Sequence, residues 1–156
     1  MLIEVKIGAL IMDPNTNTPI VVLKGIDTET ILPIWVGAFE ANAIAIEIEK
    51  IASQRPLTHD LLKNFILETG FTLSKVVISD LRNNTFYAMI ELVNDKKEIM
   101  VLDSRPSDAI ALALRLNGAI FVEQKVFDVS TTTAHSEADS PDKNVSPVEE
   151  WPDLIS

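Results

Sequence analysis

The sequence predicts a mixed α+β domain, with a largely antiparallel sheet and about three helices. The 156 residues correspond to one ordinary domain. Hydrophobic residues make up 47% of the chain, which excludes a wholly disordered protein. Strand-like segments come in runs, in the order β-β-β-α-α-β-β-β-α-β, and this order excludes a repeating βαβ unit.

Three strands are predicted at the N-terminus. Residues 2–12 are rich in Ile, Leu and Val, as a largely buried strand is, and a polar turn cluster follows them. Residues 19–24 read as the partner strand. A second turn leads into residues 31–36, where Pro33 indicates an edge position or a bulge because proline lacks the N–H that a central strand needs.

Two helices are predicted next. Residues 39–52 repeat apolar side chains at helical spacing. Pro56 interrupts this pattern because proline disfavours helical backbone in the residue before it. Thr58 is a good N-cap for a helix that runs to about residue 69. Gly70 then suits the position at which a helix stops.

The following segment predicts an antiparallel meander of three strands, over residues 71–79, 85–93 and 98–102, joined by polar turns. Ser104 or Arg105 can cap a third helix, which has a proline in its first turn and ends at an Asn-Gly pair. We expect residues 120–126 to form the last strand.

The charge is unevenly spread along the chain. The net charge is −10, and residues 131–156 contribute half of it, with one basic and six acidic residues. We therefore expect a folded domain over residues 1–129 and an acidic, disordered tail over residues 130–156. The chain lacks the overall basic footprint of a non-specific nucleic-acid binder, so any nucleic-acid function must depend on a local site.

Composition excludes several classes of protein. There is no cysteine, hence no disulfide framework, no thiolate zinc site and no cysteine nucleophile. No apolar run reaches the roughly 18 residues of a membrane helix, and the N-terminus lacks the basic region of a signal peptide. We expect a soluble, cytoplasmic protein without a membrane partner.

The first candidate site is the segment Arg55-Pro56-Leu57-Thr58-His59-Asp60. A helix N-terminus offers free N–H groups and a positive dipole end, which together bind phosphate. Arg55 and Thr58 are candidate phosphate-binding residues, and His59 can serve as general acid or base, which is the commonest catalytic role of a histidine. The simpler interpretation is an ordinary helix start, with Asp60 favourable to the dipole and His59 merely solvated.

The second candidate is Asp103-Ser104-Arg105-Pro106-Ser107-Asp108, which repeats the Arg-Pro pair at a helix start. A plain capping segment also explains it. Two such starts facing one cleft would form an anion-binding pocket, with Arg105 and Ser107 on phosphate. Glu40 belongs to the first helix and borders its apolar face, where a carboxylate can bind a hard cation.

Both segments, together with Ile34-Trp35-Val36-Gly37 and the run Asp108-Ala109-Ile110-Ala111-Leu112-Ala113, resemble the bifunctional nuclease family over roughly residues 1–127. The resemblance implies a mixed α/β domain that self-associates, as a homodimer or higher homo-oligomer, and that degrades both DNA and RNA. Many relatives carry a short helical motif at the C-terminus, where this chain has its acidic segment.

The leading hypothesis is a nuclease of low sequence specificity. His59 would be the general acid or base. The aspartates Asp60, Asp103 and Asp108 would orient it or bind a divalent cation that activates water. Asp60 and Asp108 are assigned to catalysis, and Asp103 and Glu40 to holding Mg or Mn. The alternative is a non-catalytic, oligomeric binding or regulatory module that uses the same polar pocket. A third interpretation makes both arginines structural.

Overall fold

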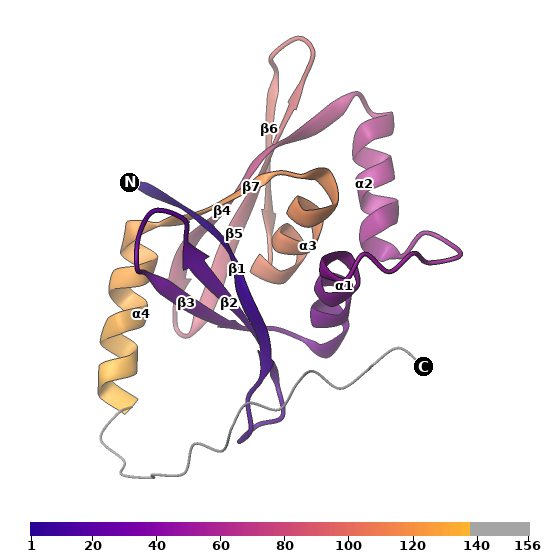
Figure 1. Ribbon diagram of the computed structural model, residues 1–156. Helices are drawn as coiled ribbons and strands as arrows, with labels where there is room; N and C mark the ends of the chain where they lie inside the picture. Colours follow the sequence, from indigo (N-terminus) through magenta and orange to yellow (C-terminus); the bar gives the residue numbers. More distant parts are fainter. Residues whose placement is uncertain (138–156) are drawn as a thin grey trace.

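The computed structural model describes the backbone of residues 1–137 and the side chains of residues 1–132 (Figure 1). Within this part, one seven-stranded sheet packs with four helices. The strands are β1 (Leu2–Met12), β2 (Pro19–Gly25), β3 (Ile31–Trp35), β4 (Phe71–Arg82), β5 (Thr85–Asn94), β6 (Ile99–Ser104) and β7 (Ala119–Glu123). The helices are α1 (Ala38–Ile48), α2 (Thr58–Glu68), α3 (Pro106–Leu116) and α4 (Gln124–Glu137).

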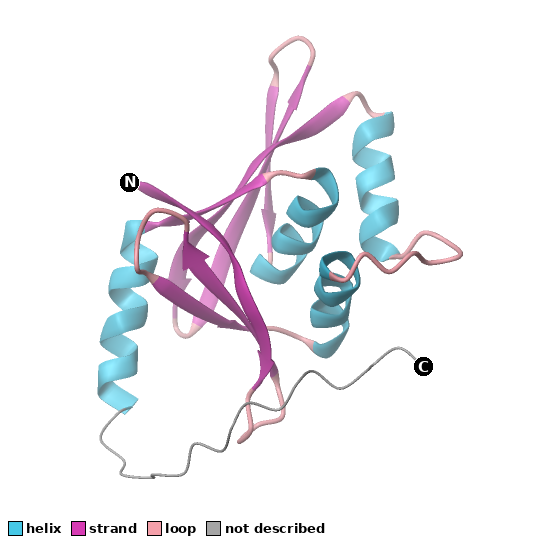
Figure 2. Cartoon of the chain, viewed as in Figure 1, coloured by secondary structure: helices cyan, strands magenta, loops and turns pink. Residues whose placement is uncertain are grey.

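The strand order is β3-β2-β1-β7-β4-β5-β6. Every neighbouring pair is antiparallel except β4 and β7, which are parallel. The last strand in the sequence thus joins the N-terminal strands to the central meander, and Figure 2 shows the strands as one twisted layer. The predicted α+β class and the largely antiparallel sheet are confirmed.

The two edges of the sheet are formed by β3 and β6. Pro33 lies in β3, opposite Val22 of β2, so the edge position predicted from this proline is confirmed. The β4–β5 hairpin has a tighter turn than expected. Asn83 and Asn84 both adopt positive φ (51° and 59°), which is the backbone of a two-residue hairpin loop, and the flanking strands therefore extend to the turn.

Helices α1, α2 and α3 lie together on one side of the strands in Figure 1. Helix α3 is central, because it contacts α1, α2, β4 and β5 and buries residues 109–113 almost completely. Its alanines let the neighbouring helices approach closely. Helix α1 ends at Ile48, four residues before the predicted end, because Lys50 adopts a positive φ of 55° that a helix cannot continue through.

The fourth helix corrects the predicted C-terminal strand. Strand β7 ends at Glu123 and α4 begins at once, with Val126 and Phe127 buried. The helix packs against β3, β4 and β7, on the opposite side of the strands from α1–α3 in the view of Figure 1. It continues past the expected boundary at residue 129, and the rest of the predicted tail, residues 138–156, lies outside the described residues.

None of the described helices combines the length and the apolar composition that crossing a membrane requires.

Candidate active site

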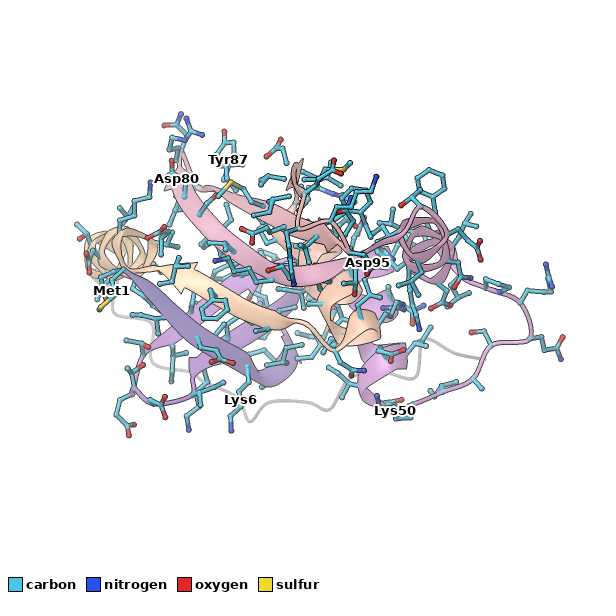
Figure 3. All side chains as sticks on the ribbon, turned by 90° about the horizontal axis from the view of Figure 1, so that it is seen from above. Met1, Lys6, Lys50, Asp80, Tyr87 and Asp95 are labelled. Carbon is cyan, nitrogen blue, oxygen red and sulfur yellow. The ribbon has the colours of Figure 1, made fainter. Side chains whose placement is uncertain are left out.

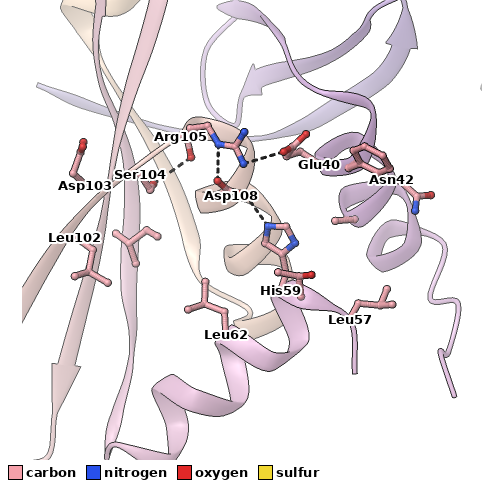
Figure 4. Close-up of a pocket in the computed structure, with 14 residues that line it drawn as sticks. Glu40, Asn42, Leu57, His59, Leu62, Leu102, Asp103, Ser104, Arg105 and Asp108 are labelled. Carbon is pink, nitrogen blue, oxygen red and sulfur yellow. Dashed lines mark hydrogen bonds and ion pairs between the residues drawn. The ribbon is translucent and has the colours of Figure 1, made fainter. Parts of the chain in front are cut away.

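A pocket of about 730 Å³ opens where the starts of α2 and α3 meet α1 and the end of β6 (Figure 4). Part of its wall is apolar and is formed by Phe39, Leu62 and Leu102. Its ionisable lining consists of Glu40, His59, Asp103, Arg105 and Asp108. The two helix starts that the sequence singled out therefore face one cleft.

The start of α2 points His59 toward this pocket. Thr58 is the first helical residue and Leu57 is the N-cap, so the predicted Thr58 cap is wrong. The reason is that Asp60 caps the helix instead, because its Oδ2 accepts a hydrogen bond of 2.9 Å from the Leu57 backbone N–H. The side chain of Thr58 still lines the pocket.

The start of α3 presents Arg105 and Asp108. Arg105 is the N-cap and Pro106 the first helical residue, where proline's missing N–H costs nothing. Ser107 is buried, at 5% exposure, and does not line the pocket, so its predicted contact with phosphate has no geometric support.

His59 and Asp108 form the centre of the site. The Nε2 atom of His59 lies 2.8 Å from Oδ1 of Asp108, across 49 positions of sequence. The His59 side chain is 12% exposed and that of Asp108 is 27% exposed. Burial raises the pKa of Asp108, but hydrogen bonds from His59 and Arg105 outweigh it and hold that pKa below its ordinary value. Asp108 is therefore ionised at neutral pH.

Arg105 connects this pair to helix α1. Its Nε donates to Oδ2 of Asp108 at 2.8 Å, and its Nη2 lies 2.9 Å from Oε1 of Glu40. The hydrogen bond to Asp108 and the attraction of both carboxylates raise the pKa of the guanidinium. The side chain is nevertheless 65% exposed, so it retains N–H donors for a ligand.

Asp60 belongs to a different cluster from its neighbour His59. Its Oδ1 accepts a hydrogen bond of 2.9 Å from Nε of Arg115, which is only 2% exposed. Arg115 also donates to the backbone oxygens of Ala111 and Ala43, each at 2.9 Å, and so ties the three helices together. Sequence reasoning missed Arg115, although a lone arginine in the apolar run of α3 was a visible signal.

Arg55 also lies away from the pocket. It is exposed in the loop between α1 and α2 and lines a separate hollow of about 350 Å³ with Asp60 and Lys63. The expectation that Arg55 and Arg105 share one cleft is therefore not met. The residues of the two Arg-Pro segments that do meet are His59, from the start of α2, and Asp108, from the start of α3.

The two predicted metal ligands, Glu40 and Asp103, both line the pocket but belong to different elements. Glu40 is paired with Arg105, and Asp103 is exposed on β6. Among the described residues, no group of three or more His, Asp or Glu side chains converges as a metal centre. Asn42, on α1, also lines the pocket, and its Oδ1 is buried without a hydrogen-bond partner in the described part of the chain.

Comparison with known proteins identifies the family to which this chain is similar. The family model of the bifunctional nuclease domain matches residues 21–135. An uncharacterized protein of Mycobacterium tuberculosis is 39% identical over 123 residues, which are 79% of this chain and 73% of that protein.

Two rice proteins are also similar. Bifunctional nuclease 2 of Oryza sativa subsp. japonica is 31% identical over 69% of this chain and 34% of its own length. Bifunctional nuclease 1 of Oryza sativa subsp. indica is 27% identical over 68% of this chain and 33% of its own length. The match thus covers about a third of each rice protein.

Proposed function

Because the chain belongs to the bifunctional nuclease domain family, we propose that it hydrolyses phosphodiester bonds of DNA and RNA with low sequence specificity. The single observation that carries this proposal beyond the family is the hydrogen-bonded series His59–Asp108–Arg105–Glu40 in one pocket. It joins a group that can move a proton to a cation that can bind phosphate.

His59 is the proposed general base. Its Nε2 faces the ionised Asp108, which favours the tautomer that carries its proton on Nε2 and leaves Nδ1 as the acceptor. A water molecule would lose a proton to Nδ1 as its oxygen bonds to phosphorus. The phosphorus–oxygen bond to the leaving group breaks, and the imidazolium returns the proton to that oxygen. Asp108 is then a positioning residue that also stabilises the charged imidazole.

Phosphate binding is assigned to Arg105 and the start of α2. The guanidinium contacts Asp108 through Nε and Glu40 through Nη2. Its remaining N–H groups, on the exposed side, can donate hydrogen bonds to a phosphate. Thr58 adds a hydroxyl at a helix N-terminus, where the free N–H groups and the dipole favour an anion. These groups would stabilise the charge that develops on the phosphoryl oxygens.

The pocket lining carries more negative than positive charge, and this favours a metal cation as cofactor. Three carboxylates, of Glu40, Asp103 and Asp108, stand against one guanidinium. Such a lining repels a phosphodiester unless a cation accompanies it. Mg or Mn therefore stays part of the proposal. Because Arg105 already holds Glu40 and Asp108, the residues do not form a ready ligand set, and we assign no step to the metal.

The same acidity favours a second candidate function. A non-catalytic binding or regulatory module would use Arg105 to hold the helix starts together and would keep the pocket for a ligand that is not a polyanion. The net charge of −10 supports this alternative. It predicts no hydrolysis under any condition.

The decisive experiment measures hydrolysis of single-stranded DNA and RNA by the purified chain, with Mg²⁺, with Mn²⁺ and with EDTA. His59→Ala should lower turnover by at least about 100-fold, since a general base contributes that much or more. Arg105→Ala should raise KM. The matched control is Arg82→Ala, because Arg82 is also exposed and ion-paired, to Asp80 at 3.0 Å.

Arg82 does not line the pocket. It lies over the Tyr87 ring beside the β4–β5 turn, and Figure 3 shows Asp80 and Tyr87 on the other side of the molecule from Lys50. Cleavage that is equal in the wild type and in His59→Ala would reject the site. Absence of cleavage in every condition would support the binding module.

We further infer a cytoplasmic homo-oligomer. The absence of cysteine is compatible with a reducing compartment, and the exposed apolar side chains of β6 support self-association.

A further inference from the structure

Phe39 is the most exposed large apolar side chain in the described part of the protein, at 88%. It is the second residue of α1 and lines the candidate active site, next in sequence to Glu40, which binds Arg105. A phenylalanine normally contributes to folding by being buried. This ring contributes little in that way and is open to a ligand that enters the pocket.

The pocket is larger than a phosphate group requires. Its volume of about 730 Å³ lies within the roughly 300–1,000 Å³ of sites that hold small organic molecules. Besides Phe39, its apolar lining includes Leu57, Leu62 and Leu102 (Figure 4). One volume thus offers apolar side chains to one part of a ligand and the guanidinium of Arg105 to another. A nucleotide has two such parts, the flat base and the phosphate.

The charge of the lining indicates which part of a nucleotide fits beside α1. Arg105 is the one arginine or lysine among the lining residues, against three carboxylates. The carboxylates repel a phosphate that is not held by Arg105. A base is uncharged, and its N–H groups can donate hydrogen bonds to carboxylate and amide oxygens. The acidic lining therefore accepts the base more readily than a second phosphate.

Asn42 gives an independent indication of a ligand at the same helix. It follows Phe39 by three residues, so both belong to one face of α1, and both line the pocket. Its Oδ1 is buried and has no hydrogen-bond partner in the described part of the chain. An acceptor left without a partner costs free energy. An N–H group of a base would satisfy it once the amide turns toward the pocket.

We propose that Phe39 is the stacking platform for one base of a single-stranded nucleic acid whose phosphate binds Arg105. Every base has a π face, so stacking on an aromatic ring holds a strand without reading its sequence. In a duplex the neighbouring bases cover these faces, and the ring therefore selects unpaired strands. The inference rests on the proposed function and names the substrate class of the same site.

Equilibrium binding tests the stacking without hydrolysis. His59→Ala protein in Mg²⁺ is titrated with two fluorescent phosphorothioate strands, oligo(dT) and an abasic strand of equal length, whose linkages resist cleavage. Adding Phe39→Ala should weaken binding of oligo(dT) by about 5- to 150-fold, the effect of losing one base–aromatic stack. Binding of the abasic strand should not change, and Phe39→Trp should retain the affinity for oligo(dT). The matched control is Phe65→Ala, because Phe65 is also exposed, at 66%, and does not line the pocket.

Four results would overturn the stacking. They are an unchanged affinity in Phe39→Ala, an equal loss for both strands, an equal loss in Phe65→Ala, and no binding of either strand by the parent protein. A solution mass that falls on Phe39→Ala would also overturn it, since a second copy would then cover the ring. Hydrolysis by the wild type with no effect of Phe39→Ala on binding refutes the stacking alone. Binding of oligo(dT) that depends on Phe39, without hydrolysis under any condition, refutes the proposed catalysis alone.

Discussion

Asp60 offers the sharpest test of the structure, because sequence reasoning made it catalytic and the geometry makes it structural. Its carboxylate accepts one hydrogen bond from the Leu57 N–H at the start of α2 and one from the buried Arg115, both at 2.9 Å. We predict that Asp60→Ala lowers the free energy of unfolding by about 3 kcal/mol. About 1 kcal/mol comes from the lost cap, and about 1.5–3 kcal/mol comes from the lost hydrogen bond to a charged donor.

The assay is thermal and urea unfolding, together with turnover per folded molecule. For a chain of this size, a change of about 3 kcal/mol lowers Tm by roughly 6–12 °C. Asp60→Asn keeps an acceptor for the cap and should lose less. A double-mutant cycle of Asp60→Ala and Arg115→Met should show that the two changes in unfolding free energy are not additive, because each variant removes the same hydrogen bond between Asp60 and Arg115.

A structural role for Asp60 can be refuted in two ways. If Asp60→Ala changes stability by less than about 1 kcal/mol, then the bond to Arg115 has no net value. If turnover is abolished while Tm is retained, then Asp60 acts in catalysis, as its place beside His59 suggested. The wild-type rate in a destabilised Asp60→Ala variant supports the structural role.

The other predictions concern the proton-transfer pair, acid stability and backbone packing. Asp108→Asn should lower turnover by about 100-fold or more, measured by the same hydrolysis of DNA and RNA, because the carboxylate that orients His59 is lost. The pKa of Asp60 and of Asp108 is lowered in the fold, so the stability they contribute is present above about pH 4 and is lost as pH falls below that value. Tm should therefore fall steeply below about pH 4, and less steeply in Asp60→Asn. Gly118→Ala should cost about 1–3 kcal/mol in urea unfolding, because its Cβ would clash with Leu73. Gly70→Ala meets no neighbour and should cost only the strain of its positive φ, about 1 kcal/mol.

Much of the fold was predictable because its signals are local. Apolar runs between turn clusters placed all seven strands, and Pro33 marked an edge. Helix α4 was not predictable in this way. Its three consecutive threonines, Thr131 to Thr133, and its polar composition disfavour helix formation. What stabilises it is the burial of Val126 and Phe127, in a helix that packs against β3 and β4, which are distant in sequence, and against the adjoining β7.

In the candidate site, too, the local features were predictable from the sequence and the contacts between distant segments were not. The two Arg-Pro segments were visible as helix starts, but which of their residues meet depends on how the helices pack. The bond between His59 and Asp108 spans 49 positions and exists because α2 and α3 pack side by side. Arg55 precedes its helix by three positions and remains in the exposed loop, whereas Arg105 is the N-cap itself and so faces the pocket.

The separation of His59 from Asp60 follows from the geometry of a helix. Neighbouring residues of a helix point about 100° apart, so His59 and Asp60 can face different surroundings. Asp60 turns toward Arg115, inside the helix layer, and this leaves His59 to face the pocket. The partner of His59 must then come from another helix, and Asp108 supplies it. The repeated pattern of an Arg-Pro pair and a nearby aspartate therefore encodes two different roles, since the first aspartate joins α2 to α3 and the second orients the histidine.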